Sequence, residues 1–254
     1  MARTRTRKNA TKGGTNNSQR LGARKRLPIN ADQMVPIEPL TENQSKMFKA
    51  WDEGKHMFIY GAAGTGKTFC ALYKALYDCL KSTPNYDSVY LVRSLVATRE
   101  IGFLPGSHED KADIYQIPYK NMVKYMFECG SDEEFEYLYG GLKSQETVKF
   151  WSTSFLRGVT LDNAVIIIDE MQNLSFHELD SIITRVGENS RIIFCGDAMQ
   201  SDLRNTNEKN GIHNFMRILE LMPDDFEMIE MGINDICRSG LVRNYLIAKH
   251  SIEA

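Results

Sequence analysis

The sequence has no long apolar run and no cysteines at disulfide-framework or metal-binding spacing. Its wholly apolar runs reach no more than five residues, as at 164–168, whereas a membrane-spanning helix needs ~20. The N-terminus lacks the apolar segment of a secretory signal. The five cysteines never form a C-x-x-C pair, and the five histidines show no metal-ligand spacing. We therefore expect a soluble, cytoplasmic protein with reduced thiols and no membrane partner.

Acidic residues are absent from the first 30 positions, which hold nine of the 31 Lys and Arg residues. The rest of the 254-residue chain carries 22 basic and 33 acidic residues, so a net charge of −2 conceals a tail of +9 and a body of −11. The tail has no aromatic residue and almost nothing apolar to bury. We expect residues 1–38 to be a disordered basic tail and linker. Such a tail either attracts the phosphates of single-stranded RNA or DNA or only keeps the protein in solution.

Residues 61–68, GAAGTGKT, fill every fixed position of the phosphate-binding pattern G-x-x-x-x-G-K-[ST]. An apolar run at 57–60 precedes them and an Ala- and Leu-containing stretch at 69–80 follows, which predicts a loop between a strand and a helix. Lys67 would place a cation on the β- and γ-phosphates of ATP, and the Thr68 hydroxyl would ligate Mg²⁺. The predicted nucleotide-binding residues of this loop are Gly61, Ala62, Ala63, Gly64, Thr65, Gly66, Lys67 and Thr68.

A second chemical landmark is the apolar run at 164–168, which ends in the carboxylates Asp169 and Glu170. Burial on both faces predicts a central strand of a parallel sheet. Asp169 would hold magnesium through water, and Glu170 would polarise the attacking water. The strand expected at 191–196 also ends in polar residues, and Gln200 beyond it is placed to sense the γ-phosphate.

Further strands are expected at 88–94 and 226–231. Helices are expected at 41–50, 69–80, 114–129, 133–139, 175–186, 211–221 and 241–250. A stripe of Tyr, Met and Phe on the helices at 114–129 and 133–139 is interpreted as core rather than as a platform for nucleic acid.

Two polar residues each have two interpretations. Gln44 either completes the capping box that Thr41 opens or reads the adenine edge with its amide. Arg238 is either an arginine finger, offsetting charge on the transferred phosphoryl group, or a partner in a surface salt bridge.

Taken together, these segments resemble the PhoH-like family, which comprises phosphate-starvation-inducible ATPases akin to the first motor domain of superfamily 1 helicases. The matching segments are GAAGTGKT at 61–68, Arg93, GFLPG at 102–106, FLRGVTLDNAVIIIDEMQN at 155–173, CGDAMQSDL at 195–203 and DICRSGLV at 235–242. Short relatives of this kind also occur in bacteriophages. Met171 and the pair Ala198-Met199 depart from the usual pattern of the family without removing a catalytic group.

The resemblance implies an α/β fold, a three-layer RecA-like P-loop NTPase with a mainly parallel central sheet, over residues 39–254. It assigns Lys67 and Thr68 to phosphate and magnesium, and Asp169 and Glu170 to hydrolysis. It also assigns Gln200 to sensing and Arg238 to the finger role.

The expected activity is Mg²⁺-dependent hydrolysis of ATP, coupled to binding or unwinding of single-stranded RNA or DNA. Since the chain has one motor domain, neighbouring subunits would have to supply Arg238, which favours a homo-oligomeric ring such as a hexamer. The alternative is a nucleotide-gated regulatory protein that moves no strand. A small-molecule phosphotransferase is disfavoured, because Asp169 and Glu170 fit the activation of water.

Overall fold

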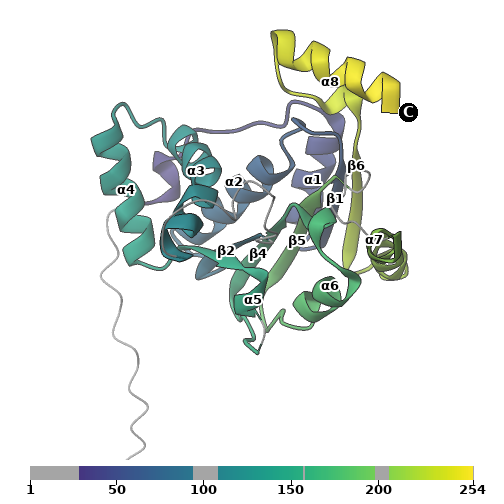
Figure 1. Ribbon diagram of the computed structural model, residues 1–254. Coiled ribbons are helices and arrows are strands. Elements are labelled where there is room, and N and C mark those ends of the chain that lie inside the picture. Colours follow the sequence, from purple (N-terminus) through teal and green to yellow (C-terminus); the bar gives the residue numbers. More distant parts are fainter. Residues whose placement is uncertain (1–28, 94–107, 157, 198–205, 254) are drawn as a thin grey trace, which may run out of the picture.

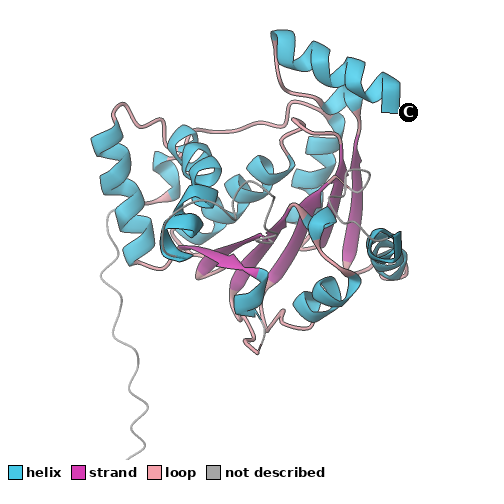
Figure 2. Ribbon diagram, in the orientation of Figure 1, coloured by secondary structure: helices cyan, strands magenta, loops and turns pink. Residues whose placement is uncertain are grey.

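Six strands form one sheet at the centre of the molecule (Figure 2). They are β1 (His56–Gly61), β2 (Ser88–Arg93), β3 (Val148–Ser152), β4 (Ala164–Asp169), β5 (Arg191–Gly196) and β6 (Phe226–Met231). Their order in the sheet is β3-β2-β4-β5-β1-β6, and every pairing is parallel. This computed structural model describes residues 29–93, 108–156, 158–197 and 206–253.

Helices lie on both faces of the sheet and give the molecule three layers (Figure 1). They are α1 (Glu42–Asp52), α2 (Lys67–Leu80), α3 (His108–Met126), α4 (Asp132–Ser144), α5 (Thr153–Leu156), α6 (Phe176–Ile183), α7 (Thr206–Glu220) and α8 (Gly240–Glu253). Helices α1 to α4 cover one face and α5 to α7 the other, while α8 stands apart from both layers. The predicted three-layer α/β architecture with a parallel sheet is confirmed.

Alternation of side chains along the strands divides the core in two. In β4, Val165 and Ile167 join the cluster under α1 to α4, while Ile166 and Ile168 join the cluster under α6 and α7. Successive residues of a strand point to opposite faces, so a strand buried on both sides must be apolar at every position. This explains the uninterrupted run of β4 that marks it as central in the sequence.

The strands and helices predicted from the sequence are confirmed, with shifted ends for several helices. Helix α3 begins at His108 rather than near residue 114, and α4 extends to Ser144 rather than ending at 139. Strand β3 was missed. It pairs with β2 alone among the described strands and is only partly buried, so Lys149 and Ser152 interrupt the apolar pattern that identifies the inner strands.

The segment before α1 was predicted to be linker up to residue 38, but its described part packs on the domain. Ala31 and Met34 are buried in the core under α1 to α4. The Val35 amide donates to the Met126 carbonyl oxygen at 2.7 Å, and the Ile37 amide donates to the Tyr73 hydroxyl at 3.2 Å. The predicted boundary near residue 38 is therefore too late. The domain includes the described residues before α1, from residue 29 onward.

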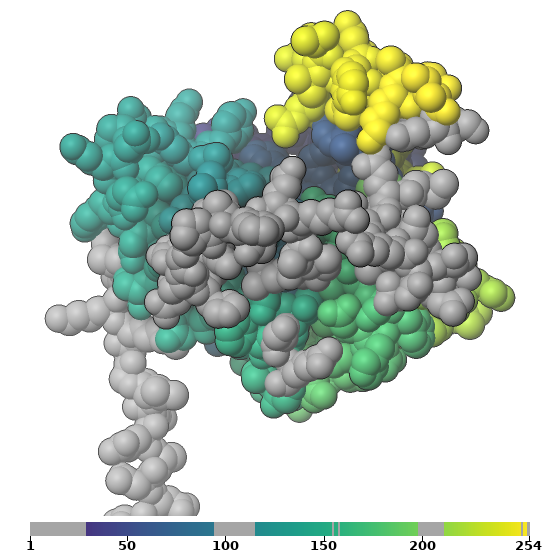
Figure 3. Space-filling model, viewed as in Figure 1, coloured from purple at the N-terminus to yellow at the C-terminus, as the bar shows by residue number. Residues whose placement is uncertain are grey.

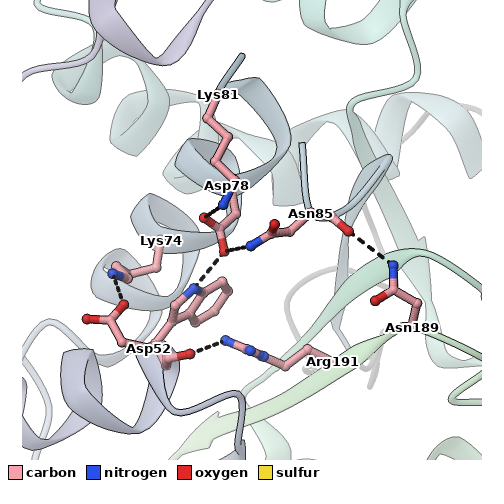
Figure 4. A network of polar contacts seen from close by, with 8 residues as sticks. Asp52, Lys74, Asp78, Lys81, Asn85, Asn189 and Arg191 are labelled. Atoms are coloured by element: carbon pink, nitrogen blue, oxygen red, sulfur yellow. Dashed lines mark hydrogen bonds and ion pairs between the residues drawn. The ribbon is translucent and has the colours of Figure 1, made fainter. Parts of the chain in front are cut away.

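A polar cluster ties elements together at the amino ends of the strands (Figure 4). The Arg191 guanidinium at the start of β5 lies 4.5 Å from the Trp51 ring and 5.6 Å from the Tyr86 ring, and it donates to the Trp51 carbonyl oxygen at 2.7 Å. The Trp51 indole donates in turn to Asp78 at 2.9 Å. The cluster therefore holds the ends of α1 and α2 to β5, at the edge of the sheet opposite to the carboxyl ends of the strands.

No helix in the described part of the chain combines the length and apolar character needed to cross a bilayer. The basic residues before position 29, the GFLPG segment and Gln200 lie outside the described residues.

Candidate active site

Three glycines curl the loop between β1 and α2. Gly61 has a φ of +122°, and a Cβ there would lie 2.1 Å from the Met231 carbonyl oxygen, so only glycine fits. Gly64 and Gly66 have φ values of +78° and +83°, a region that residues with side chains disfavour. Gly66 is also the N-cap of α2. A loop of this kind ahead of a helix N-terminus makes a concave, anion-binding backbone surface.

Lys67 is buried inside this loop. Its ammonium donates to the Gly61 and Ala62 carbonyl oxygens at 2.8 and 2.7 Å, and it lies 3.4 Å from the Thr65 hydroxyl. Burial lowers the pKa of Lys67, and nearby carboxylates oppose that shift only in part. A phosphate bound in the loop would supply the negative charge that carbonyl oxygens do not.

The two predicted magnesium ligands lie in direct contact. The Thr68 hydroxyl donates to Asp169 Oδ1 at 2.6 Å, which joins the start of α2 to the end of β4. A hydroxyl and a carboxylate are the oxygen ligands that Mg²⁺ takes when phosphates and water complete its shell. No cluster of three or more His, Cys, Asp or Glu side chains that could hold a metal occurs among the described residues. The donor set therefore fits a magnesium ion that arrives with a nucleotide.

Asp169 has a second partner that the sequence did not reveal. The Tyr119 hydroxyl, from α3, donates to Asp169 Oδ2 at 2.6 Å. Tyr119 lies on the aromatic stripe that we interpreted as core, and the residue is indeed 3% exposed. Only the position of its hydroxyl gives it a place in the site, and the residue pattern contains no signal for that.

Glu170 has a left-handed backbone, with a φ of +54°. Its carboxylate accepts a hydrogen bond from the Gln172 side-chain amide at 2.5 Å and lies 3.9 Å from the Arg93 guanidinium. Gln172 also accepts from the Asp197 amide at 3.0 Å. These contacts hold the candidate base at the carboxyl edge of β4, between the ends of β2 and β5, and Gln172 is a second residue that sequence reasoning missed.

Gln44 is buried against the phosphate loop, with both ends of its amide engaged. Its Nε2 donates to the Thr65 carbonyl oxygen at 2.9 Å and to Cys237 Sγ at 3.1 Å, and its Oε1 accepts from the Leu40 amide at 2.8 Å. Thr41 caps α1 as predicted, because its side chain accepts from the Gln44 amide. The side chain of Gln44 reaches back to Leu40 rather than to the cap residue. To read an adenine edge, it would have to exchange one of these bonds.

Arg238 lies beside the phosphate loop of its own chain. The neighbouring Cys237 amide donates to the Gly64 carbonyl oxygen at 3.0 Å, and a Cβ added to Gly64 would lie 2.9 Å from Arg238 Cγ. The exposed Arg238 side chain lines the same cavity as Lys67 and Glu170. Arg238 of the same chain is therefore a candidate for the finger role, beside the expected supply of this arginine by a neighbouring subunit.

The described catalytic and metal-binding candidates open onto one cavity of about 990 Å³. Its polar part contains Lys67, Thr68, Asp169, Glu170, Arg93 and Arg238, and its apolar part includes Ile37, Phe69 and Met122. A volume of this order accommodates a nucleotide. Gln200 is the predicted site residue that lies outside the described part of the chain.

A phosphate loop facing two carboxylates, at the carboxyl edge of a three-layer parallel sheet, defines a P-loop NTPase of RecA-like fold. A family model described as "PhoH-like protein" matches residues 36–249. The PhoH-like protein of Mycobacterium tuberculosis is 33% identical over 217 residues, which cover 85% of this chain and 58% of that protein. Protein PhoH of Escherichia coli is 30% identical over 222 residues, which cover 84% and 58%. The chain belongs to the PhoH-like protein family and spans about three fifths of the length of these curated relatives.

Solved structures of a terminase and of a helicase are also similar. The large terminase from a thermophilic bacteriophage matches with 10% identity and a TM-score of 0.46, over 84% of this chain and 50% of that one. The Pif1 helicase from Bacteroides matches with 16% identity and a TM-score of 0.41, over 79% and 43%.

Proposed function

We propose that this chain binds ATP with Mg²⁺ and hydrolyses it, and that hydrolysis is coupled to single-stranded RNA or DNA. The observation that carries the first half is the 2.6 Å contact between Thr68 and Asp169, with Lys67 and Glu170 on the same cavity. It joins the phosphate-binding side of the site to the carboxylate side.

The residues would divide the reaction as follows. The loop amides and Lys67 hold the phosphates, and Thr68 and Asp169 hold the magnesium ion, which offsets phosphate charge when bound. Glu170 orients a water molecule and accepts its proton, with Gln172 keeping the carboxylate in place. Arg238, from the same chain, offsets the charge that develops on the transferred phosphoryl group. Gln200 keeps its predicted role as the sensor of the γ-phosphate.

Support for a nucleic-acid partner comes from charge. The first 30 residues carry nine Lys and Arg and no acidic residue, and such a segment can neutralise several phosphates. The test is phosphate release from ATP and Mg²⁺, with and without single-stranded RNA or DNA, by the full chain and by a chain lacking residues 1–30. Stimulation by one polymer would name the partner, and its loss in the shortened chain would assign the tail as the tether. Hydrolysis indifferent to both polymers would overturn the coupling and favour a nucleotide-gated regulator.

We also propose that the chain assembles with copies of itself, and helix α8 supplies a reason independent of Arg238. In Figure 3, α8 is the yellow projection that rises above the rest of the surface. Leu241, Tyr245 and Ile252 are 84%, 64% and 86% exposed, and their spacing of four and seven residues places them on one side of the helix. An apolar stripe of this kind in water marks an interaction surface.

The assembly is tested by light scattering. Replacing Leu241 and Ile252 by serine should lower the mass of the particle, whereas Leu221→Ser, at a site 83% exposed outside α8, should leave it unchanged. An unchanged mass in the α8 variant would remove this surface from the proposal, and a monomeric wild-type protein would remove the assembly.

A further inference from the structure

The carboxylate of Asp169 is held on both sides, by two different parts of the fold. Thr68 donates to Oδ1 from the start of α2, and Tyr119 donates to Oδ2 from the middle of α3, each at 2.6 Å. A carboxylate with a short, charge-assisted hydrogen bond to each oxygen has its orientation fixed. The two carboxylate oxygens of Asp169 would therefore face a magnesium ion, or water bound to it, in one fixed orientation.

Tyr119 is well placed to act in this way because its own position is constrained. The residue is 3% exposed, and its ring lies 5.5 Å from the Phe150 ring of β3. Tyr119 also lines the cavity that contains Lys67 and Glu170, so its hydroxyl reaches the site while its ring packs against β3.

The Arg93 guanidinium places a positive charge beside Tyr119 and Asp169. Burial lowers the pKa of Arg93, but the neighbouring Tyr119, Glu170 and Asp169 outweigh that effect and raise it. The Arg93 guanidinium also lies 5.9 Å from the Tyr115 ring of α3. Tyr115 and Tyr119 are one helical turn apart, so one side of α3 faces the carboxyl ends of β2 and β4 with two aromatic residues.

We propose that Tyr119 is a positioning residue for the metal, whose hydroxyl fixes Asp169 and thereby makes the Mg²⁺ affinity of the site depend on the placement of α3. The proposal rests on the proposed nucleotide function. Residues that orient a metal-binding side chain typically contribute about 10- to 100-fold to metal affinity. We expect Tyr119 to contribute at the lower end, about 10-fold, because Thr68 retains its hold on the other oxygen.

The test compares Tyr119→Phe with Tyr90→Phe. Tyr90 is a matched control, because it is only 8% exposed and its hydroxyl accepts a hydrogen bond, from Lys149 at 3.1 Å, away from Asp169. Binding of a fluorescent ADP is measured as a function of Mg²⁺ concentration and again with the metal chelated. Thermal melting establishes that each variant is folded, and Tyr119→Met replaces Tyr119→Phe if the latter does not melt cooperatively.

Tyr119→Phe should need about 10-fold more Mg²⁺ for the same effect on ADP binding, with unchanged affinity for ADP in the absence of metal. Tyr90→Phe should match the wild type. In an Asp169→Ala background the effect of Tyr119→Phe should vanish, because the hydrogen bond that joins the two residues is already absent. An unchanged Mg²⁺ requirement in Tyr119→Phe, or the same change in the Asp169→Ala background, would overturn the inference. A wild-type protein that binds no ADP would instead overturn the proposed function.

Discussion

The left-handed backbone of Glu170 predicts that the proposed catalytic carboxylate is maintained at a cost in stability. Its φ of +54° is a conformation that costs a residue with a Cβ roughly 1–2 kcal/mol, and glycine adopts it freely. The informative comparison is between Glu170→Ala and Glu170→Gly. Both variants lose the hydrogen bond from Gln172 and the ion pair with Arg93, so these losses cancel.

We expect Glu170→Gly to be more stable than Glu170→Ala by about 1 kcal/mol. The greater flexibility of glycine in the unfolded chain removes part of the gain, which is why the lower end of the range applies. For a domain of this size, 1 kcal/mol corresponds to about 2–4 °C in Tm. Urea unfolding of the two variants, followed by circular dichroism, measures the difference. Equal stabilities, or a more stable alanine variant, would show that the backbone at this position is not strained.

Three further changes test other parts of the structure. Arg238→Ala should lower phosphate release at least ~100-fold with ADP affinity retained. Mixing this variant with Glu170→Gln should restore no phosphate release if each arginine serves its own chain. Recovery of phosphate release in the mixture would show that Arg238 serves a neighbouring chain. Arg191→Met should lower the free energy of unfolding by about 1.5–3 kcal/mol, because it removes the charged hydrogen bond to the Trp51 carbonyl oxygen, without changing ADP affinity. A selective loss of affinity would contradict its purely structural role. Burial, followed by the Arg191 charge, lowers the pKa of His56 in the folded protein, and its Nδ1 accepts a hydrogen bond from the Ile192 amide. The imidazole of His56 therefore binds a proton more readily in the unfolded chain than in the folded one. Stability should therefore fall as the pH drops below about 6.5, and the fall should be smaller in His56→Gln; identical pH profiles would refute this.

The sequence predicted the inner part of the fold well because burial leaves a direct pattern. Strands β1, β4 and β5 lie in the middle of the sheet, so their apolar runs and the polar residues that end them are visible without coordinates. Among the described strands β3 pairs with β2 alone, and Lys149 and Ser152 interrupt its apolar pattern, so the same reasoning passes over it. The start of the domain was missed for a related reason, since two buried side chains, Ala31 and Met34, make no period.

The candidate site was predictable where its residues follow one another in a motif. Lys67, Thr68, Asp169 and Glu170 were identified from their positions next to strands, and they meet at one cavity. Tyr119 and Gln172 were not identified, because both side chains are buried and only their hydrogen bonds to Asp169 and Glu170 bring them into the site. Contacts of this kind depend on how helices pack over the sheet, which no local pattern of residues encodes.

The most direct test of the account is phosphate release from ATP and Mg²⁺ by the wild-type protein and by Glu170→Gln, with ATP binding measured on the same samples. The account predicts that the wild type releases phosphate, and that Glu170→Gln binds ATP with similar affinity but releases phosphate at least ~100-fold more slowly, since general base catalysis contributes about 10²- to 10⁴-fold. Equal rates in the two proteins would contradict the role of Glu170, and a wild-type protein that binds no ATP would contradict the site itself.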